Sequence, residues 1–411
     1  MIRRGRVGLA ITTLAIAAIA VATLRPDWSE GETVWRLCLV CGDRPVADVL
    51  ANVILFLPLG VGLALAGVRE RRIWISGALL SSLVELIQLI LPGRDASVGD
   101  VAFNTLGVAA GAASVTWFPR MCQALSGRSW GAGVSAAAIG LAVAATGWLF
   151  GPSFPDSTYW GQWTPLLGHL AWYRGHVLHA EIGGRTIPSH RVADSRAVRA
   201  SLSAAAPISV EAVAGPPVTR LAPLFSMADE ASREITLVGI QGDDLVFRWR
   251  TRAWRFGLDQ PDIRFLHGMS DVGAGDPLRV SVTRKGTADW CIAVNGRTAC
   301  GLGITAGRGW ALISFPPALP DWMRNVLDGL WLAALAFPLG LALRPSLLGA
   351  AALSVAVVVL IVGSRWVGLL PPGLPGWGGF FVGLGTGGVV ARLAWRPSGA
   401  LEARHPPRPV G

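Results

Sequence analysis

Three long apolar stretches of this 411-residue sequence each carry a pair of polar residues, at the start of the stretch or near its end. The members of each pair are three or four residues apart, which places both side chains on one face of a helix. Polar groups inside apolar helices are costly, so they usually face a protein interior or a water-filled cavity. The pairs are Asp48 with Asn52, Glu85 with Gln88, and Asp100 with Asn104.

Arg94, between the second and third pairs, adds a cation. An arginine can hold a phosphate or carboxylate through two parallel hydrogen bonds, and it can equally keep neighbouring acids ionised. If the three stretches cross a membrane in alternating directions, all three pairs lie near the same membrane surface. We therefore predict one pocket, formed by Asp48, Asn52, Glu85, Gln88, Arg94, Asp100 and Asn104.

The three carboxylates are the candidates for chemistry in this pocket. Asp48, Glu85 and Asp100 suit ligand binding or catalysis, with Glu85 as a buried acid or base whose pKa burial would raise. The sequence leaves open whether the protein is an enzyme, and it favours binding without reaction.

Several of the same residues also have a structural interpretation. The amides of Asn52, Gln88 and Asn104 can join helices through interhelical hydrogen bonds. Ser97 is placed to cap the third helix, with Asp100 three residues later completing a pair that resembles a capping box. Small residues four apart in the same stretch, Gly107 and Gly111, predict a close helix-packing face.

The elements that must position these residues are predicted to be transmembrane helices. Hydrophobic residues make up 52% of the chain and charged residues 15%, against about 25% charged in soluble domains. The apolar residues are gathered into runs close to the length of about 20 residues that a membrane span requires. Eight runs qualify: 7–24, 49–68, 73–91, 101–118, 132–150, 326–343, 347–363 and 380–394.

The net charge of +10 marks the sidedness of these spans. Arginines gather in alternate connections, which predicts a cytoplasmic N-terminus and places 151–320 outside the cytoplasm. No stretch interleaves basic and aromatic residues as a nucleic-acid interface would, so we expect no nucleic-acid partner. The run 7–24 has a cleaved signal peptide as its alternative, because Ala20-Val21-Ala22 resembles a cleavage site.

Residues 151–320 are predicted to form a β domain. Apolar runs are short there, polar and apolar residues alternate, and turn residues recur. Gly242-Asp243-Asp244 precedes one such run, and Asn295-Gly296, a strong hairpin signal, follows another.

The order and spacing of the polar pairs resemble the VanZ-like family over about 45–118. The resemblance rests on Asp48-x3-Asn52-x3-Phe56-x-Pro58-x-Gly60, then Glu85-x2-Gln88, then Arg94-x5-Asp100-x3-Asn104-x2-Gly107-x3-Gly111. It implies a helical fold in the bacterial cytoplasmic membrane. It also implies a link to resistance against teicoplanin-type glycopeptides, with which VanZ itself is associated.

The segment 176–316 resembles a concanavalin A-like or laminin-G-like jelly roll. This resemblance rests on the run Gly242 to Arg248 and on Val294-Asn295-Gly296. Such domains are often joined to VanZ-like segments. Some of them bind carbohydrate or calcium, and others only pack.

The cysteines and histidines do not predict a metal site or a cofactor. Cys291 and Cys300 flank the Asn295-Gly296 turn and are expected to form a disulfide in an oxidising compartment. Cys38 and Cys41 lack a second Cys/His pair, which favours a small disulfide or free thiols. Cytoplasmic Cys122 is expected to stay reduced. His176 and His179, three apart in a strand or loop, are poorly spaced for a metal.

The sequence therefore predicts an α-helical multi-pass membrane protein of about eight spans with an extracytoplasmic all-β, jelly-roll-like domain. We expect the bilayer as one partner and an envelope glycan or a lipid-linked wall precursor as the ligand. The alternatives are an enzyme or transporter-like protein that handles such a precursor, and a structural envelope component. The predicted segments are 1–24 (first helix), 25–120 (VanZ-like), 121–150 (helix), 151–320 (β domain), 321–395 (three helices) and 396–411 (disordered tail).

Overall fold

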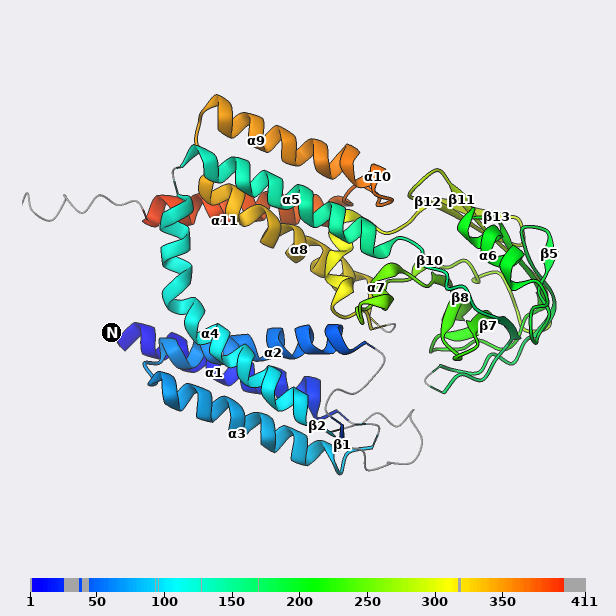
Figure 1. Cartoon of the computed structure of the whole chain (residues 1–411), viewed down its shortest axis with the longest axis horizontal. Helices are drawn as coiled ribbons and strands as arrows, with labels where there is room; N and C mark the ends of the chain where they lie inside the picture. Colours follow the sequence, from blue (N-terminus) through cyan, green and yellow to red (C-terminus); the bar gives the residue numbers. More distant parts are fainter. Residues whose placement is uncertain are drawn as a thin grey trace, which may run out of the picture.

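A computed structural model describes residues 2–25, 37–38, 44–92, 94, 96–126, 128–168, 170–316 and 319–394. Two groups of long helices lie side by side, and a β domain sits at one end of both (Figure 1). The predicted tail and Cys41 fall outside the described residues. The first group consists of α1 (Ile2–Thr23), α2 (Pro45–Leu65), α3 (Glu70–Gln88) and α4 (Val98–Leu125). The second consists of α5 (Ser129–Phe150), α8 (Asp321–Ala342), α9 (Leu347–Val358), α10 (Ser364–Trp366) and α11 (Leu374–Ala394).

Seven of the helical segments in the described residues are long and apolar enough to cross a membrane, where the sequence suggested eight. The difference is α3, which begins with Glu70-Arg71-Arg72 and buries Glu85. It still lies alongside α1, α2 and α4 (Figure 1). The chain is thus a membrane protein whose third helix is markedly more polar than the rest. The seven segments are Arg4–Thr23, Pro45–Leu65, Val98–Leu125, Trp130–Phe150, Asp321–Ala342, Leu347–Trp366 and Leu374–Leu393.

Glycines bring α2 and α4 into backbone contact. A Cβ atom on Gly107 would lie 2.4 Å from the carbonyl oxygen of Val53, and one on Gly111 would lie 2.0 Å from that of Leu57. Gly60 of α2 meets the Val108 carbonyl oxygen in the same way, at 1.9 Å. The packing face predicted from Gly107 and Gly111 is confirmed, and it fixes the relative position of two of the helices that carry the polar pairs.

A second glycine stripe joins α11 to α8. Cβ atoms on Gly379, Gly383 and Gly387 would lie 1.9, 2.2 and 2.4 Å from carbonyl oxygens of α8. Helix α11 begins at Leu374. The predicted last span, 380–394, is thus longer at its N-terminal end than the sequence suggested. Glycine is unfavourable in an isolated helix, but in a membrane it allows two backbones to approach closely.

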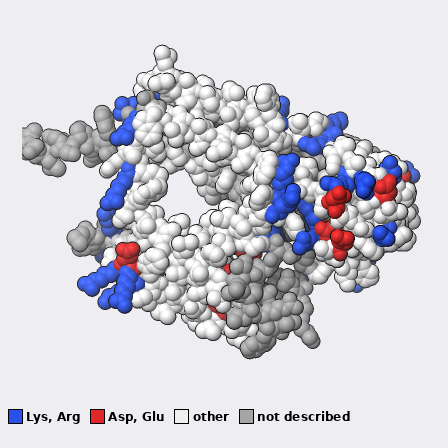
Figure 2. Space-filling model, in the orientation of Figure 1, with Lys and Arg blue, Asp and Glu red and all other residues white. Residues whose placement is uncertain are grey.

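The second half of α4 turns away from its own group and crosses to the second group, at the end far from the β domain (Figure 1). Pro119 lies inside this helix, and because proline has no N–H it removes a helical hydrogen bond and favours a kink. Phe118 stacks on Phe337 of α8 with ring centroids 5.9 Å apart. Figure 2 shows an opening between the two groups of helices.

The β domain contains two antiparallel sheets. Phe247 of one sheet and Trp290 of the other have ring centroids 5.0 Å apart, so the sheets share a core. The first sheet has the order β10-β9-β8-β7-β3, with β3 Tyr159–Trp163, β7 Ala222–Asp229, β8 Glu234–Gln241, β9 Asp244–Trp249 and β10 Ile263–Phe265. The second has the order β13-β12-β11-β6-β4-β5, with β4 His176–Ile182, β5 Arg185–Thr186, β6 Ile208–Val213, β11 Pro277–Lys285, β12 Asp289–Val294 and β13 Arg297–Leu302.

Turns and short elements complete the domain. Asn295 and Gly296 adopt positive φ angles of 49° and 89° between β12 and β13, as a tight hairpin requires. A disulfide between Cys291 and Cys300 joins these two strands. The shorter elements are α6 (Ser195–Ser203), α7 (Arg252–Arg255), the 3-10 helix Ala306–Leu312, and the parallel pair β1 (Leu37–Cys38) and β2 (Ala96–Ser97) beside the first helices.

The glycine stripe of α11 gives a direct test of the packing. Gly383→Ala should lower stability by about 1–3 kcal/mol, because the new methyl group overlaps the backbone of α8. Gly385, on the same helix, has open space around its Cβ position. Gly385→Ala should therefore leave stability unchanged or raise it by up to about 1 kcal/mol. Thermal unfolding in detergent would measure both, and equal effects would contradict the close contact.

Candidate functional site

Asp48, Asn52 and Asp100 meet where α2 and α4 begin, at the end nearest the β domain. Asp48 and Asn52 are on the first turns of α2, and Asp100 is on the first turn of α4. The Asn52 amide hydrogen-bonds to the Asp100 carboxylate, and the charges of Asp48 and Asp100 interact. Asp48 is exposed. These two acids therefore form a polar rim at the helix ends.

Glu85 approaches this rim from α3 and is only 8% exposed. Its Oε2 accepts a hydrogen bond of 2.7 Å from the backbone N–H of Ser97, and its charge interacts with that of Asp100. Ser97 caps α4, because its Oγ accepts from the Asp100 N–H at 3.3 Å and its side chain also contacts the Asp100 carboxylate. The predicted Ser97 cap is confirmed, but the Ser97 N–H, which a capping box would pair with Asp100, donates to Glu85 instead.

The two buried amides join helices. Gln88 Nε2 donates to the carbonyl oxygen of Thr23, at the end of α1, over 3.0 Å. Asn104 Nδ2 donates to Ser81 Oγ of α3 over 2.9 Å. The Asn104 Oδ1 atom is buried without a hydrogen-bond partner among the described residues. These contacts support the structural interpretation for Gln88 and Asn104.

Arg94 lies beside α1. Its Nε donates to the Arg25 carbonyl oxygen at 3.1 Å and its Nη2 to that of Ala22 at 3.4 Å. A cation placed on the last carbonyls of a helix satisfies their acceptors and stabilises the helix dipole. The observed hydrogen bonds of Arg94 therefore serve the end of α1, where the sequence had suggested a role within the pocket itself.

An apolar groove of about 880 Å³ runs between α3 and α4, and Glu85 lines it. Leu86 and Leu106 line it and are 63% and 51% exposed, so the groove opens sideways from the helices. Glu85 is the one charged residue among those that line it. The volume lies within the range of about 300–1,000 Å³ that small-molecule sites occupy. The remaining lining residues are Trp74, Ser82, Leu89, Ala96, Ser97, Val98, Val101, Ala102, Phe103 and Thr105.

Sequence reasoning missed the contact that joins this site to the β domain. The N–H groups of Val46 and Ala47, at the start of α2, donate to the Gly257 carbonyl oxygen at 3.0 and 2.9 Å. Arg44 pairs with Asp259 at 2.5 Å. Asp259 is 6% exposed, and its Oδ2 also accepts from the Phe315 N–H at 2.7 Å.

Only a weak signal for this contact exists in the sequence. Arg44 stands directly before Pro45, the first residue of α2, which marks it as a residue at a helix start. Nothing local identifies Asp259 as its partner, because the two are 215 positions apart.

The site could act on hydrogen-bonding groups of a ligand. Glu85 lines the apolar groove and interacts with Asp100 of the neighbouring rim, so the site combines acceptors for hydroxyl or amino groups with space for a hydrocarbon chain. The described residues contain no cluster of His, Cys, Asp and Glu suited to a metal ion. His179 contacts Glu181 in β4 at 2.7 Å instead.

Comparison with known protein families gives a match over the first helices. The family model described as VanZ/LLP1 matches residues 12–119, which covers the second half of α1, all of α2 and α3, and most of α4. The helices that carry the site are thus VanZ-like, and the match begins earlier than the resemblance read over 45–118. No curated protein and no solved structure matches the chain.

The buried Asp259 should be essential for stability. Asp259→Ala leaves the Phe315 N–H and the Arg44 guanidinium without their acceptor, at a cost of about 1–3 kcal/mol for each donor that stays buried. Asp271 forms an exposed pair with Arg297, so Asp271→Ala should change stability by less than about 1 kcal/mol. Thermal unfolding of the full chain compares the two. Equal losses of stability in the two variants would show that the contacts of Asp259 do not stabilise the fold.

Proposed function

We propose that this VanZ-like membrane protein binds a lipid-linked ligand of the bacterial cell envelope. The hydrocarbon chain of the ligand occupies the groove between α3 and α4. Its head group lies against Glu85, Asp100 and Asp48. The observation that carries the proposal is the apolar groove that opens sideways and has a single carboxylate, Glu85, in its lining.

The shape and chemistry of the groove support a lipid. Its exposed wall residues, including Leu86, Val98 and Leu106, would face acyl chains in a bilayer. A ligand could therefore enter from the membrane without first crossing water. A soluble ligand would instead need an aqueous entrance lined by polar residues.

The acids favour a head group rich in hydroxyl or amino groups. Carboxylates are hydrogen-bond acceptors, so sugar hydroxyls and ammonium groups suit them and a bare phosphate does not. Glu85 already accepts one N–H, from Ser97, and a carboxylate has room for about three further hydrogen bonds. The sugar hydroxyls and amide N–H groups of a lipid-linked cell-wall precursor suit these acceptors, and its phosphate linkage would have to lie away from the carboxylates.

We place the β domain outside the cytoplasm of a bacterial cell, with the N-terminus inside. The Cys291–Cys300 disulfide supports this orientation, because disulfides persist in oxidising compartments. We further propose that the two antiparallel sheets form a jelly-roll-like module that recognises envelope glycans. A role in glycopeptide resistance follows if the bound precursor is the antibiotic's target.

A structural role is the second candidate. Gln88 bonds to α1, Asn104 to α3 and Glu85 to the start of α4, so all three contribute to helix assembly. In this case the groove would hold ordinary lipid, and the acids would only stabilise the ends of the helices.

Binding of a polyprenyl-linked disaccharide-pentapeptide to the purified full chain tests the proposal. Glu85→Gln should weaken binding about tenfold or more, because it removes a charge-assisted acceptor in the lining of the groove. The control is Glu70→Gln, at the exposed opposite end of α3, which should bind as the native protein does.

The accumulation of each variant in the membrane separates the two candidates. Normal accumulation of Glu85→Gln with weakened binding supports the ligand site. Normal accumulation with native affinity refutes it. If Glu85→Gln fails to accumulate, Asp100→Asn and Asp48→Asn, which remove charge from the rim, serve the same comparison. Teicoplanin susceptibility of cells that express each variant tests the link to resistance.

A further inference from the structure

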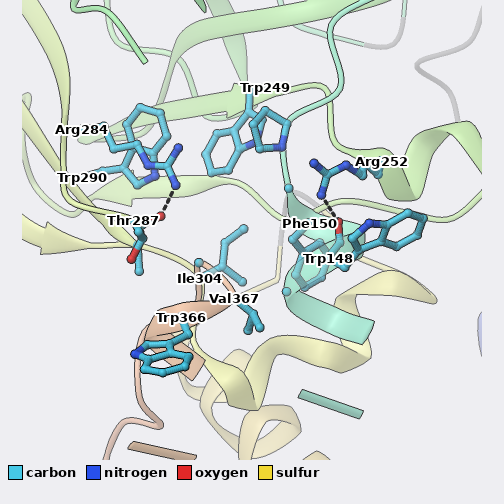
Figure 3. Close-up of a pocket in the computed structure, with 15 residues that line it drawn as sticks. Trp148, Phe150, Trp249, Arg252, Arg284, Thr287, Trp290, Ile304, Trp366 and Val367 are labelled. Atoms are coloured by element: carbon cyan, nitrogen blue, oxygen red, sulfur yellow. Dashed lines mark hydrogen bonds between the residues drawn. The ribbon is translucent and has the colours of Figure 1, made fainter. Parts of the chain in front are cut away.

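A second pocket lies on the other group of helices, where α5 and α10 end and the β domain begins. It has a volume of about 340 Å³. Figure 3 shows that its walls come from three parts of the chain: the end of α5 with Trp148, the β domain with Trp249 and Trp290, and the end of α10 with Trp366. It is separate from the groove at Glu85 and shares no lining residue with it.

Two arginines line the pocket without a counter-ion. Arg252 donates to the Trp148 carbonyl oxygen at 3.0 Å, and Arg284 donates to the Thr287 carbonyl oxygen (Figure 3). No aspartate or glutamate is among the residues that line this pocket, and neither arginine forms an ion pair within the described residues. The pocket therefore carries two positive charges with no compensating acid.

Arg284 is the less satisfied of the two. Its Nε atom is buried without a hydrogen-bond partner in the described part of the chain. Its guanidinium lies 5.6 Å from the centre of the Trp290 ring. Burial lowers the pKa of this arginine, which reflects the cost of removing its charge from water. A bound anion would offset that cost and supply the missing acceptor.

The position of the pocket indicates where such an anion comes from. Trp148 and Trp366 are 51% and 84% exposed, and each lies in the last turns of a helix that is long and apolar enough to span the membrane. Exposed tryptophans at this depth are typical of the region of lipid head groups. Basic side chains gather at the same junction of helices and β domain (Figure 2).

We propose that the pocket between α5, α10 and the β domain binds the phosphate of a membrane-lipid head group through Arg252 and Arg284. The tryptophans pack against the glycerol and the upper acyl chains. The contact holds the β domain at the membrane surface, because Arg284 belongs to β11 and Thr287 Oγ1 donates to the Arg365 carbonyl oxygen of α10 at 2.8 Å. The proposal does not depend on a ligand at Glu85.

Thermal unfolding of the full chain in detergent, with added lipid, tests this site. Phosphatidylglycerol should raise the unfolding temperature. Diacylglycerol, which lacks the phosphate, and inorganic phosphate, which lacks the chains, should not raise it. An equal rise with inorganic phosphate would overturn the assignment to a lipid, and an equal rise with diacylglycerol would overturn the assignment to its phosphate.

Variants test whether the stabilisation by lipid arises from binding in this pocket. Arg284→Gln should weaken the apparent affinity for phosphatidylglycerol about tenfold or more. It should fold well because it removes a half-buried charge that has no ion-pair partner among the described residues. Arg252→Gln is a second, independent test with the same expected direction. Arg185→Gln, on exposed β5, is the matched control and should respond as the native protein does.

The remaining outcomes are equally decisive. An undiminished lipid response in both Arg284→Gln and Arg252→Gln would overturn the proposal. A loss in Arg185→Gln as large as in the pocket variants would show that only overall charge matters, which also overturns it. Glu85→Gln should retain the response, so this site and the groove at Glu85 can fail independently.

Discussion

The ends of helices at a membrane surface leave backbone groups without partners, and the organisation of this protein depends on how these groups are satisfied. The start of α2 donates to the Gly257 carbonyl oxygen, and the start of α4 is capped by Ser97 and held by Glu85. Arg94 and Gln88 serve the carbonyls at the end of α1. The polar residues gather at one depth because the helices that need them begin and end there.

Polar contacts at the helix ends also connect the two groups of helices through the β domain. Asp259 binds Arg44 at the start of α2 and also the Phe315 N–H on the path to α8. Farther along, Asp328 of α8 accepts hydrogen bonds from Arg308 and from the Trp310 indole, the latter at 2.6 Å. A buried acid with several donors is rigid as well as stable. The β domain is therefore part of the membrane architecture as well as an appended module.

Features that depend on residues close in sequence could be predicted, and contacts between distant residues could not. The apolar runs, the Ser97 cap and the Asn295-Gly296 turn were all visible in the order and spacing of neighbouring residues. The polar character of α3 was visible too, but it was outweighed by the apolar run within it. For contacts between distant segments, such as Arg44 with Asp259 or Arg252 with Trp148, no local pattern identifies the partner. The role of Arg94 was missed because a charge near acids suggests an ion pair, whereas backbone carbonyls at the end of α1 were its partners.

The opening between the two helix groups has a mechanical consequence. In a bilayer, acyl chains have to fill that space, so the groups are coupled through fluid lipid over most of their height. Among the described residues, the groups are tied together at the crossing half of α4, where Phe118 meets Phe337, and at the start of α2, where Arg44 pairs with Asp259 and the backbone donates to Gly257. A change in bilayer thickness or lateral pressure would tilt one group against the other about these two points. The start of α2, which carries Asp48 and Asn52, lies at one of them and would sense that tilt directly.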